Sequence, residues 1–246
     1  MAQAHTYANA PGPTGSFLRS ASGQIAIDVG CGPGNLLAAL AQRARISVGV
    51  DISDVSVRLA RSVAEASADR VRVVQGNALG LPFRSACADI VVATGCLHHT
   101  GDAWAAFREV TRLLRPGGRG IVTVYRRSSY YHALYRTAAR LPRWADGRPG
   151  FDRVVNRGLL MPAFWLYFWV GRLVTHRRVR PPSYGEARNY FADQLLNPVV
   201  TFHTEADVRG WAETAGVVVE QLSTSHAGAL LNATIARPVG SGSTAG

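Results

Sequence analysis

The chain has 246 residues, of which 47% are hydrophobic, enough to bury one substantial core. Its formal net charge is +11, from 27 basic and 16 acidic side chains, and it has three cysteines at unrelated spacings. An odd number of cysteines without a Cys-x-x-Cys pair argues against a disulfide framework and a structural zinc site. We therefore expect a reducing, cytoplasmic location and no metal.

Both ends of the chain are rich in small residues. Residues 1–22 are mostly small and polar, so we expect a short N-terminal segment, too short for a helical lid and unlike a signal peptide. Residues 239–246 follow a proline and are predicted to form a flexible tail.

The positive charge is concentrated in one internal segment. Every basic residue is an arginine, and residues 126–180 hold 12 of the 27 against only two acids, Asp146 and Asp152. Such an asymmetry needs an explanation in terms of a partner or a substrate.

Strand-like and helix-like segments alternate from residue 24 onward. Apolar runs predict strands at 25–29, 46–50, 71–75, 90–93 and 119–125, and intervening segments predict helices at 35–45, 53–67 and 102–114. Regularity stops at residue 126 and resumes with a capped helix at 204–215 and two strands at 217–222 and 230–236. This alternation predicts an α/β fold with a mostly parallel sheet, helices on both faces and a hairpin at one sheet edge.

A glycine-rich loop follows the first predicted strand. Residues 28–34 read Asp-Val-Gly-Cys-Gly-Pro-Gly, and glycines let backbone N–H groups approach a ligand closely because they have no Cβ. The spacing is G-x-G-x-G, with Asp28 two residues before the first glycine, and differs from the dinucleotide fingerprint G-x-G-x-x-G. Taken alone, this loop is also compatible with an ordinary glycine turn.

Polar residues also follow the other predicted strands. Asp51 ends the second strand and could accept hydrogen bonds from ribose hydroxyls, although an ordinary surface Asp is the alternative. Asn77 follows the third strand, and His98 and His99 follow the fourth. Ligands bind beyond the carboxyl ends of strands in α/β sheets, so we expect these residues to converge on one crevice.

Further segments carry a family resemblance. Leu-Pro-Phe at 81–83, Leu-His-His at 97–99 and Leu-Leu-Arg-Pro-Gly-Gly at 113–118 resemble, in order and spacing, motifs of class I S-adenosylmethionine-dependent methyltransferases. They are most similar to the small-molecule group that includes the ubiquinone and menaquinone enzymes. The resemblance covers residues 24–125 and, more weakly, 203–236. It implies a Rossmann-like, seven-stranded, mostly parallel sheet and S-adenosylmethionine as the cofactor, with S-adenosylhomocysteine as the product.

The resemblance also assigns roles to residues. Asn77 stands where the family usually has Asp, but it keeps an acceptor oxygen. His98 and His99 are candidate proton acceptors, and the alternative is that they pack under the cofactor. Cys96 is expected to be a buried, small apolar residue. The residues that the resemblance implies for cofactor binding are Asp28, Gly30, Cys31, Gly32, Gly34, Asp51, Ile52, Asn77, Ala78 and Thr94.

The segment after the fifth strand is the candidate substrate cap. We expect a core domain at 23–125 and 203–238 and a basic, aromatic, helical cap at 126–202. The residues predicted to bind the substrate are Tyr125, Arg126, Tyr130, Tyr131, Tyr184 and Tyr190. Three interpretations remain open for the apolar stretch at 158–174 and its flanking arginines: a buried cap helix, a pocket for an apolar substrate with an anionic end, or an interfacial helix on an anionic bilayer.

These features predict transfer of the methyl group of S-adenosylmethionine, by SN2 displacement, to a small or lipid-like acceptor such as a natural product or lipid metabolite. The acceptor could be bound to a carrier protein. Two alternatives stay open: a protein that keeps the cofactor structurally and catalyses a step such as a cyclisation, and an RNA methyltransferase, which the apolar character of the basic segment makes the less favoured reading.

Overall fold

The computed structural model describes residues 12–67, 70–137, 139–166, 169 and 183–239. The chain divides into two compact units, one formed by Met1–Ser128 with Thr201–Gly246 and the other by Ser129–Val200. The expected tail at 239–246 lies outside the described residues except for Val239, and so do residues 1–11 of the N-terminal segment.

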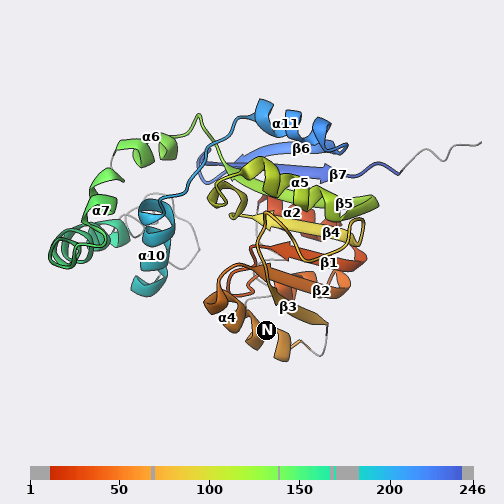
Figure 1. The fold of residues 1–246 in the computed structure, drawn as a ribbon, viewed down its shortest axis with the longest axis horizontal. Helices are drawn as coiled ribbons and strands as arrows, with labels where there is room; N and C mark the ends of the chain where they lie inside the picture. Colours follow the sequence, from red (N-terminus) through yellow and green to blue (C-terminus); the bar gives the residue numbers. More distant parts are fainter. Residues whose placement is uncertain (1–11, 68–69, 138, 167–168, 170–182, 240–246) are drawn as a thin grey trace, which may run out of the picture. The chain divides into compact units, whose positions relative to one another are not determined.

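The first unit is built on a seven-stranded sheet with the order β3-β2-β1-β4-β5-β7-β6 (Figure 1). Its strands are β1 (Gly23–Val29), β2 (Ala44–Asp51), β3 (Val71–Gln75), β4 (Ala88–Thr94), β5 (Leu114–Tyr125), β6 (Val218–Ser225) and β7 (Leu230–Ala236). Strands β1 to β5 pair in parallel, whereas β7 is antiparallel to both β5 and β6. The predicted mostly parallel sheet and its terminal hairpin are therefore confirmed.

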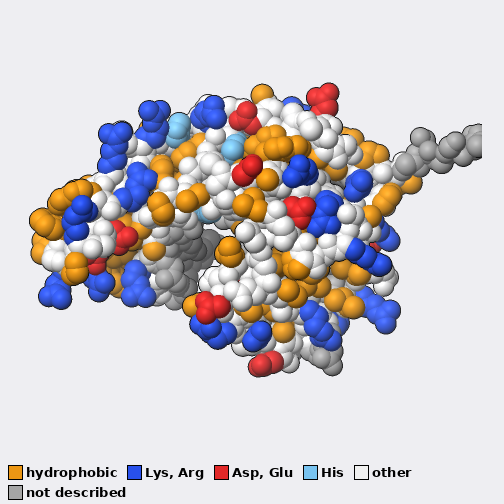
Figure 2. Space-filling view, in the orientation of Figure 1, with side chains coloured by type: hydrophobic (Ala, Val, Ile, Leu, Met, Phe, Trp, Pro, Cys, Tyr) orange, Lys and Arg blue, Asp and Glu red, His pale blue; other side chains and the backbone are white. Residues whose placement is uncertain are grey.

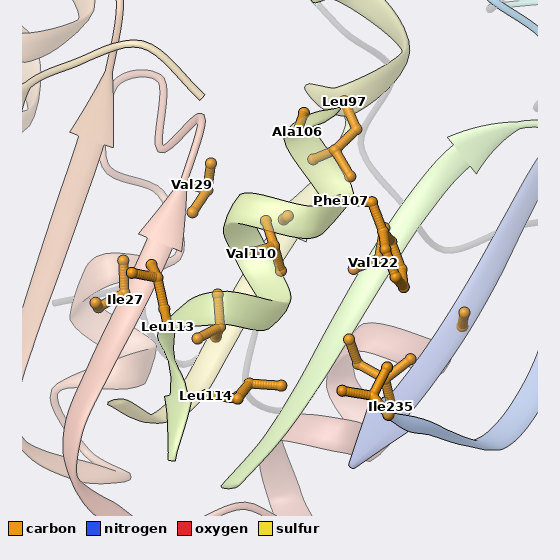
Figure 3. Close-up of a cluster of buried hydrophobic side chains, with 14 of the residues drawn as sticks. Ile27, Val29, Leu97, Ala106, Phe107, Val110, Leu113, Leu114, Val122 and Ile235 are labelled. Atoms are coloured by element: carbon orange, nitrogen blue, oxygen red, sulfur yellow. The ribbon is translucent and has the colours of Figure 1, made fainter. Parts of the chain in front are cut away.

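Strand alternation divides the buried side chains between two faces of the sheet. Ile27 and Val91 face a cluster that includes Phe107 of α5 (Ala103–Leu113) and Val208 of α11 (Glu205–Thr214) (Figure 3). Their neighbours in the strands, among them Ala26 and Ile90, belong to a second cluster with residues of α2 (Pro13–Ser20) and α3 (Leu37–Leu40). Successive side chains of a strand point to opposite faces, so one run of apolar residues can serve both layers.

Polar side chains cap the N-termini of three helices. The side chain of Ser53 caps α4 (Asp54–Glu65), Asp102 caps α5, and Thr204 forms a reciprocal capping box with Asp207 at α11.

Two predictions near the N-terminus need correction. The helix predicted at 35–45 shrinks to Leu37–Leu40, because Ala44 already pairs with Gly23 in the β1–β2 ladder. The helix α2 was not predicted at all, although the proline at its first turn is a typical helix-start signal. Phe17 and Leu18 of α2 are buried, so this helix covers one face of the sheet.

The second unit is helical. Its described elements are α6 (Tyr130–Thr137), α7 (Arg140–Ala145), α8 (Pro149–Phe151), the π-helix η2 (Asp152–Leu160), a helical segment at 161–166, α10 (Tyr184–Phe191) and the π-helix η3 (Ala192–Leu196). Met161, Ala187 and Phe191 form its small buried core, with Phe164 and Trp165 packed against them. Among the helices described, none is long and apolar enough to span a bilayer.

Candidate functional site

The glycine loop crosses the carboxyl ends of β1 and β2. Gly30 donates from its N–H to the carbonyl of Val50 at 2.8 Å, which anchors the loop to β2. Gly30, Gly32 and Gly34 have φ angles of +71°, +52° and +87°, which side chains rarely tolerate. A Cβ at Gly30 would lie 2.4 Å from the Cβ of Cys96, whereas a Cβ at Gly32 would meet open space. The loop is thus packed underneath at Gly30 and open above at Gly32.

Asp28 lies beneath this loop with an unsatisfied carboxyl oxygen. Its side chain is 1% exposed, and its Oδ2 has no hydrogen-bond partner among the described residues. Burial, and then the negative charge of Asp51, together raise the pKa of Asp28 to about 8. A buried carboxyl group of this kind would be stabilised in its ionised form by a cation.

Asp51 is held in place by backbone donors. Its Oδ2 accepts from the N–H of Gly32 at 2.9 Å, and its Oδ1 accepts from the N–H of Ser53 at 2.9 Å. Each carboxylate oxygen has a second lone pair, so Asp51 can still accept hydrogen bonds from a ligand. The next residue, Ile52, is 66% exposed and offers an apolar side chain at the same strand end.

The ends of β3 and β4 add polar groups to the same edge. The Oδ1 of Asn77 accepts from the N–H of Leu79 at 2.9 Å, so this oxygen shapes the turn, while the side chain as a whole stays exposed. Ala78 and Thr94 are half-buried. Asn77 therefore keeps its amide NH₂ group and the second lone pair of its Oδ1 for a ligand.

The two cysteines at this edge are packing residues. Cys96 donates from its Sγ to the carbonyl of Val29 at 3.0 Å, and Cys31 is buried. Burial raises the pKa of both thiols, and the nearby carboxyl group of Asp28 raises it further. Both side chains are therefore neutral thiols rather than nucleophilic thiolates. Cys96 was expected to be buried and is half-buried.

His98 and His99 form an aromatic cluster with Tyr125. The rings of His98 and Tyr125 are 3.8 Å apart between centroids, and those of His98 and His99 are 4.3 Å apart. His98 is 1% exposed, whereas His99 is half-buried. The pKa of His98 lies well below its usual value, mainly because of burial and then because of His99 and His203, so its imidazole is neutral.

Residues 201–203 join this cluster from far along the chain. Thr201 donates from its N–H and its Oγ1 to the carbonyl of His98, at 2.9 and 3.2 Å. The N–H of His203 donates to the carbonyl of Tyr125 at 2.8 Å, and Phe202 stacks with Tyr125 at 5.8 Å between ring centroids. None of these residues was predicted, because no local sequence pattern marks a contact across about a hundred residues.

The Nε2 of His203 lies 2.8 Å from the Oγ1 of Thr201. The hydroxyl of Thr201 also lies 3.2 Å from the carbonyl of His98, which can only accept. His203 donates from Nε2 when Thr201 gives its proton to His98, and it accepts at Nε2 when Thr201 gives its proton to His203. Burial lowers the pKa of His203, and Asp207 opposes this effect.

The residues predicted to bind the substrate fall into both units. In the sheet-bearing unit, Tyr125 is buried and Arg126 is half-buried. In the helical unit, Tyr131 is buried, while Tyr130 and Tyr184 are exposed. The backbone of Tyr190 belongs to α10, but its side chain lies outside the description.

Residues 27–122, which hold the glycine loop, Asp51 and the histidine pair, match the family described as "Methyltransferase domain". The sheet order and the motifs agree with that match. These residues form a methyltransferase domain, and we call the sheet-bearing unit that contains them by that name.

Two curated relatives match less than half of this chain. The chain is 37% identical over 101 residues to 27-O-demethylrifamycin SV methyltransferase of Amycolatopsis mediterranei, which is 40% of this chain and 37% of that protein. It is 35% identical over 108 residues to the O-methyltransferase rstn1 of Aspergillus nomiae, which is 43% of this chain and 48% of that protein. The matched region thus spans less than half the length of either relative.

The fold of the methyltransferase domain recurs in solved structures. Magnesium protoporphyrin IX methyltransferase of Synechocystis, crystallised with S-adenosylhomocysteine, aligns with a TM-score of 0.55 at 17% identity and covers 91% of this chain and 81% of that one. YcgJ of Bacillus subtilis aligns with a TM-score of 0.53 at 16% identity, covering 91% of this chain and 97% of that one.

The family confirms the expectation of S-adenosylmethionine as the cofactor, and the methyltransferase domain fits it. That molecule carries an ammonium and a sulfonium group, and the unsatisfied carboxyl oxygen of Asp28 suits a cation. Open space above Gly32 allows close approach to the loop, and Asp51 keeps lone pairs for hydroxyl groups.

Proposed function

We propose that the chain transfers a methyl group from S-adenosylmethionine to a hydroxyl group of a small natural-product-like or lipid-like acceptor with an anionic or partly apolar body. The observation that carries this proposal is the unsatisfied carboxyl oxygen of Asp28 beneath an open glycine loop, inside a methyltransferase domain. The two O-methyltransferase relatives support an oxygen acceptor.

Bound S-adenosylmethionine supplies an activated methyl group on a positively charged sulfur. In the SN2 displacement that we propose, a lone pair of the acceptor oxygen forms the new bond to carbon, and the electrons of the broken bond stay on sulfur. Asp28, Asp51 and the glycine loop hold the donor, and the chain needs only to align the reacting atoms and exclude water.

We propose that His99, rather than His98, takes the proton from the hydroxyl group of the acceptor. His98 is fully packed against Tyr125, and its lowered pKa makes it a weak base, which favours a packing role under the site. His99 follows the same strand and is half-buried. The H99Q variant is expected to lose about 100-fold in kcat with cofactor affinity unchanged. Equal turnover in H99Q and wild type would remove His99 from the mechanism.

The first requirement of this proposal is that the chain binds the cofactor, and a binding measurement tests it. Isothermal titration calorimetry should detect S-adenosylhomocysteine binding to wild type and a clear loss in D51A, whose carboxylate orders the loop through Gly32. The control D54N changes an exposed carboxylate three residues further along the chain, at the first residue of α4, and should bind like wild type. Absence of binding to wild type would overturn the proposal.

The acceptor itself can be sought with the purified protein. Mass spectrometry of mixtures with phenolic or polyketide-like hydroxyl compounds should show S-adenosylhomocysteine together with a methylated product. Conversion of an acceptor without S-adenosylhomocysteine would indicate the cyclisation-type alternative, and methylation of RNA instead would indicate the other. We further propose a cytoplasmic location, which the three free cysteines support.

A further inference from the structure

Exposed aromatic side chains belong to the helical unit alone, as far as the described residues go. They are Tyr130, Trp144, Phe151, Trp169 and Tyr184, with exposures from 40% to 54%. Among the described residues of the methyltransferase domain, the exposed large hydrophobic side chains are aliphatic, and those near one another in the sequence are Ile52, Val55 and Leu59, just before and along the start of α4. Exposed aromatic groups of this kind mark a surface that meets an apolar environment.

Four of the exposed apolar residues lie together. Leu141 and Trp144 are three residues apart on α7, and Phe151 and Val154 are three residues apart on the continuous turn from α8 into η2. The rings of Trp144 and Phe151 meet edge to face, with centroids 4.9 Å apart, and this contact joins the two pairs. We call these four residues the α7–η2 patch.

The patch faces away from the packed side of its helices. Asn156 is buried and donates from its Nδ2 to the carbonyl of Pro142 at 3.0 Å, which ties η2 to α7 on the inner side. The patch residues are 47% to 69% exposed. The three interpretations left open for residues 158–174 concern a later stretch, of which 167–168 and 170–174 lie outside the described residues, and these turns do not decide among them.

Arginines surround the patch. The guanidinium of Arg148 lies over the ring of Trp144, 5.0 Å from its centroid, and Arg140 stands one helical turn before Trp144. Arg153 is exposed beside Val154, and Arg157 is exposed but paired with Asp152 at 2.8 Å. Figure 2 shows blue arginine side chains between orange hydrophobic ones over the surface that carries α7.

We propose that the α7–η2 patch is an interfacial surface that binds anionic lipid bilayers. Tryptophan and phenylalanine side chains insert at the boundary between headgroups and acyl chains. The guanidinium groups of arginines lie among the lipid phosphates, while the aliphatic parts of their side chains lie along apolar surface. Two aliphatic members, Leu141 and Val154, fit acyl chains better than nucleic-acid bases or phosphates. This proposal goes beyond the proposed methyl transfer and does not depend on it.

Vesicle sedimentation of the full chain tests the surface. Wild type should pellet with vesicles of phosphatidylcholine containing about one third phosphatidylglycerol and much less with phosphatidylcholine alone, because each arginine near an anionic surface contributes to binding. The W144S/F151S variant should bind about tenfold more weakly, because both rings are lost from the interface. The R140Q/R153Q variant should also bind more weakly. Raised salt should further weaken the part of its binding that still depends on charge.

A control variant shows whether loss of binding is specific to the α7–η2 patch or follows from removing any exposed apolar side chains. V55S/L59S removes two exposed aliphatic side chains one turn apart on α4 and should bind vesicles like wild type. Circular dichroism confirms that each variant is folded. Failure of wild type to bind anionic vesicles, or equal binding by W144S/F151S, would overturn the proposal. Binding of tRNA at about 150 mM salt without vesicle binding would assign the surface to RNA and also overturn it.

Discussion

Replacing Asp28 by asparagine should change how the stability of the folded chain depends on pH. The pKa of Asp28 is raised from 3.8 to about 8, mainly by burial. The folded state therefore keeps this proton at pH values at which an unfolded Asp has already lost it. Wild type therefore loses stability as the pH rises from about 4 towards 8, and an asparagine at this position cannot contribute to that loss.

The size of the effect follows from the two pKa values. One pKa unit corresponds to about 1.4 kcal/mol, so the ionisation penalty of Asp28 is about 1.6 kcal/mol at pH 5 and about 5 kcal/mol at pH 8. The difference in unfolding free energy between D28N and wild type should thus shift by up to about 4 kcal/mol in favour of D28N over this range. For a chain of this length, that corresponds to a change of about 10 °C in the difference between their Tm values.

Thermal unfolding of the two proteins, followed by circular dichroism without ligand at pH 5, 6, 7 and 8, measures this difference. D54N is the control, because Asp54 is exposed and its pKa is lowered by its hydrogen bond to Arg58, so its substitution cannot produce the same trend. Parallel pH profiles for D28N and wild type would show that Asp28 is already ionised in the folded protein and would refute the reasoning.

Three further outcomes follow from the same geometry. Binding of S-adenosylhomocysteine at pH 7 should release about one proton from wild type and none from D28N, because a cation beside Asp28 lowers its pKa; calorimetry in two buffers of different ionisation enthalpy measures this. Gly30→Ala should destabilise the chain by about 3 kcal/mol, because the new Cβ meets Cys96 at a positive φ, and Cys96→Gly should restore part of the loss in urea unfolding. Thr204→Ala should cost about 1 kcal/mol, since it removes the hydroxyl that accepts from the N–H of Asp207; an unchanged urea midpoint would contradict this.

The fold was largely predictable because its signals are local. Apolar runs that are followed by glycine or end in Asp marked the parallel strands β1 to β4, and the predicted helix starts at Ser53, Asp102 and Thr204 are confirmed. The helix at 35–45 was overestimated because pairing of Ala44 with β1, a tertiary interaction, overrides helix propensity.

The site was predictable only in part. The spacing of the glycine loop and the position of Asp51 at a strand end placed the cofactor residues at one edge of the sheet. The burial of His98 and the contribution of residues 201–203 could not be foreseen, since they depend on contacts such as that of Thr201 with the carbonyl of His98. The role of each residue in binding and catalysis stays a prediction.

The two segments that lead into and out of the helical unit run side by side in the methyltransferase domain. Arg126 forms a parallel bridge with His203, and the N–H of Arg127 donates to the carbonyl of His203 at 2.9 Å. An insertion whose two ends meet in this way can be lengthened, shortened or exchanged without moving any strand of the sheet. Such a junction lets evolution, or a protein engineer, exchange the helical unit as a whole while the sheet and its glycine loop are kept intact.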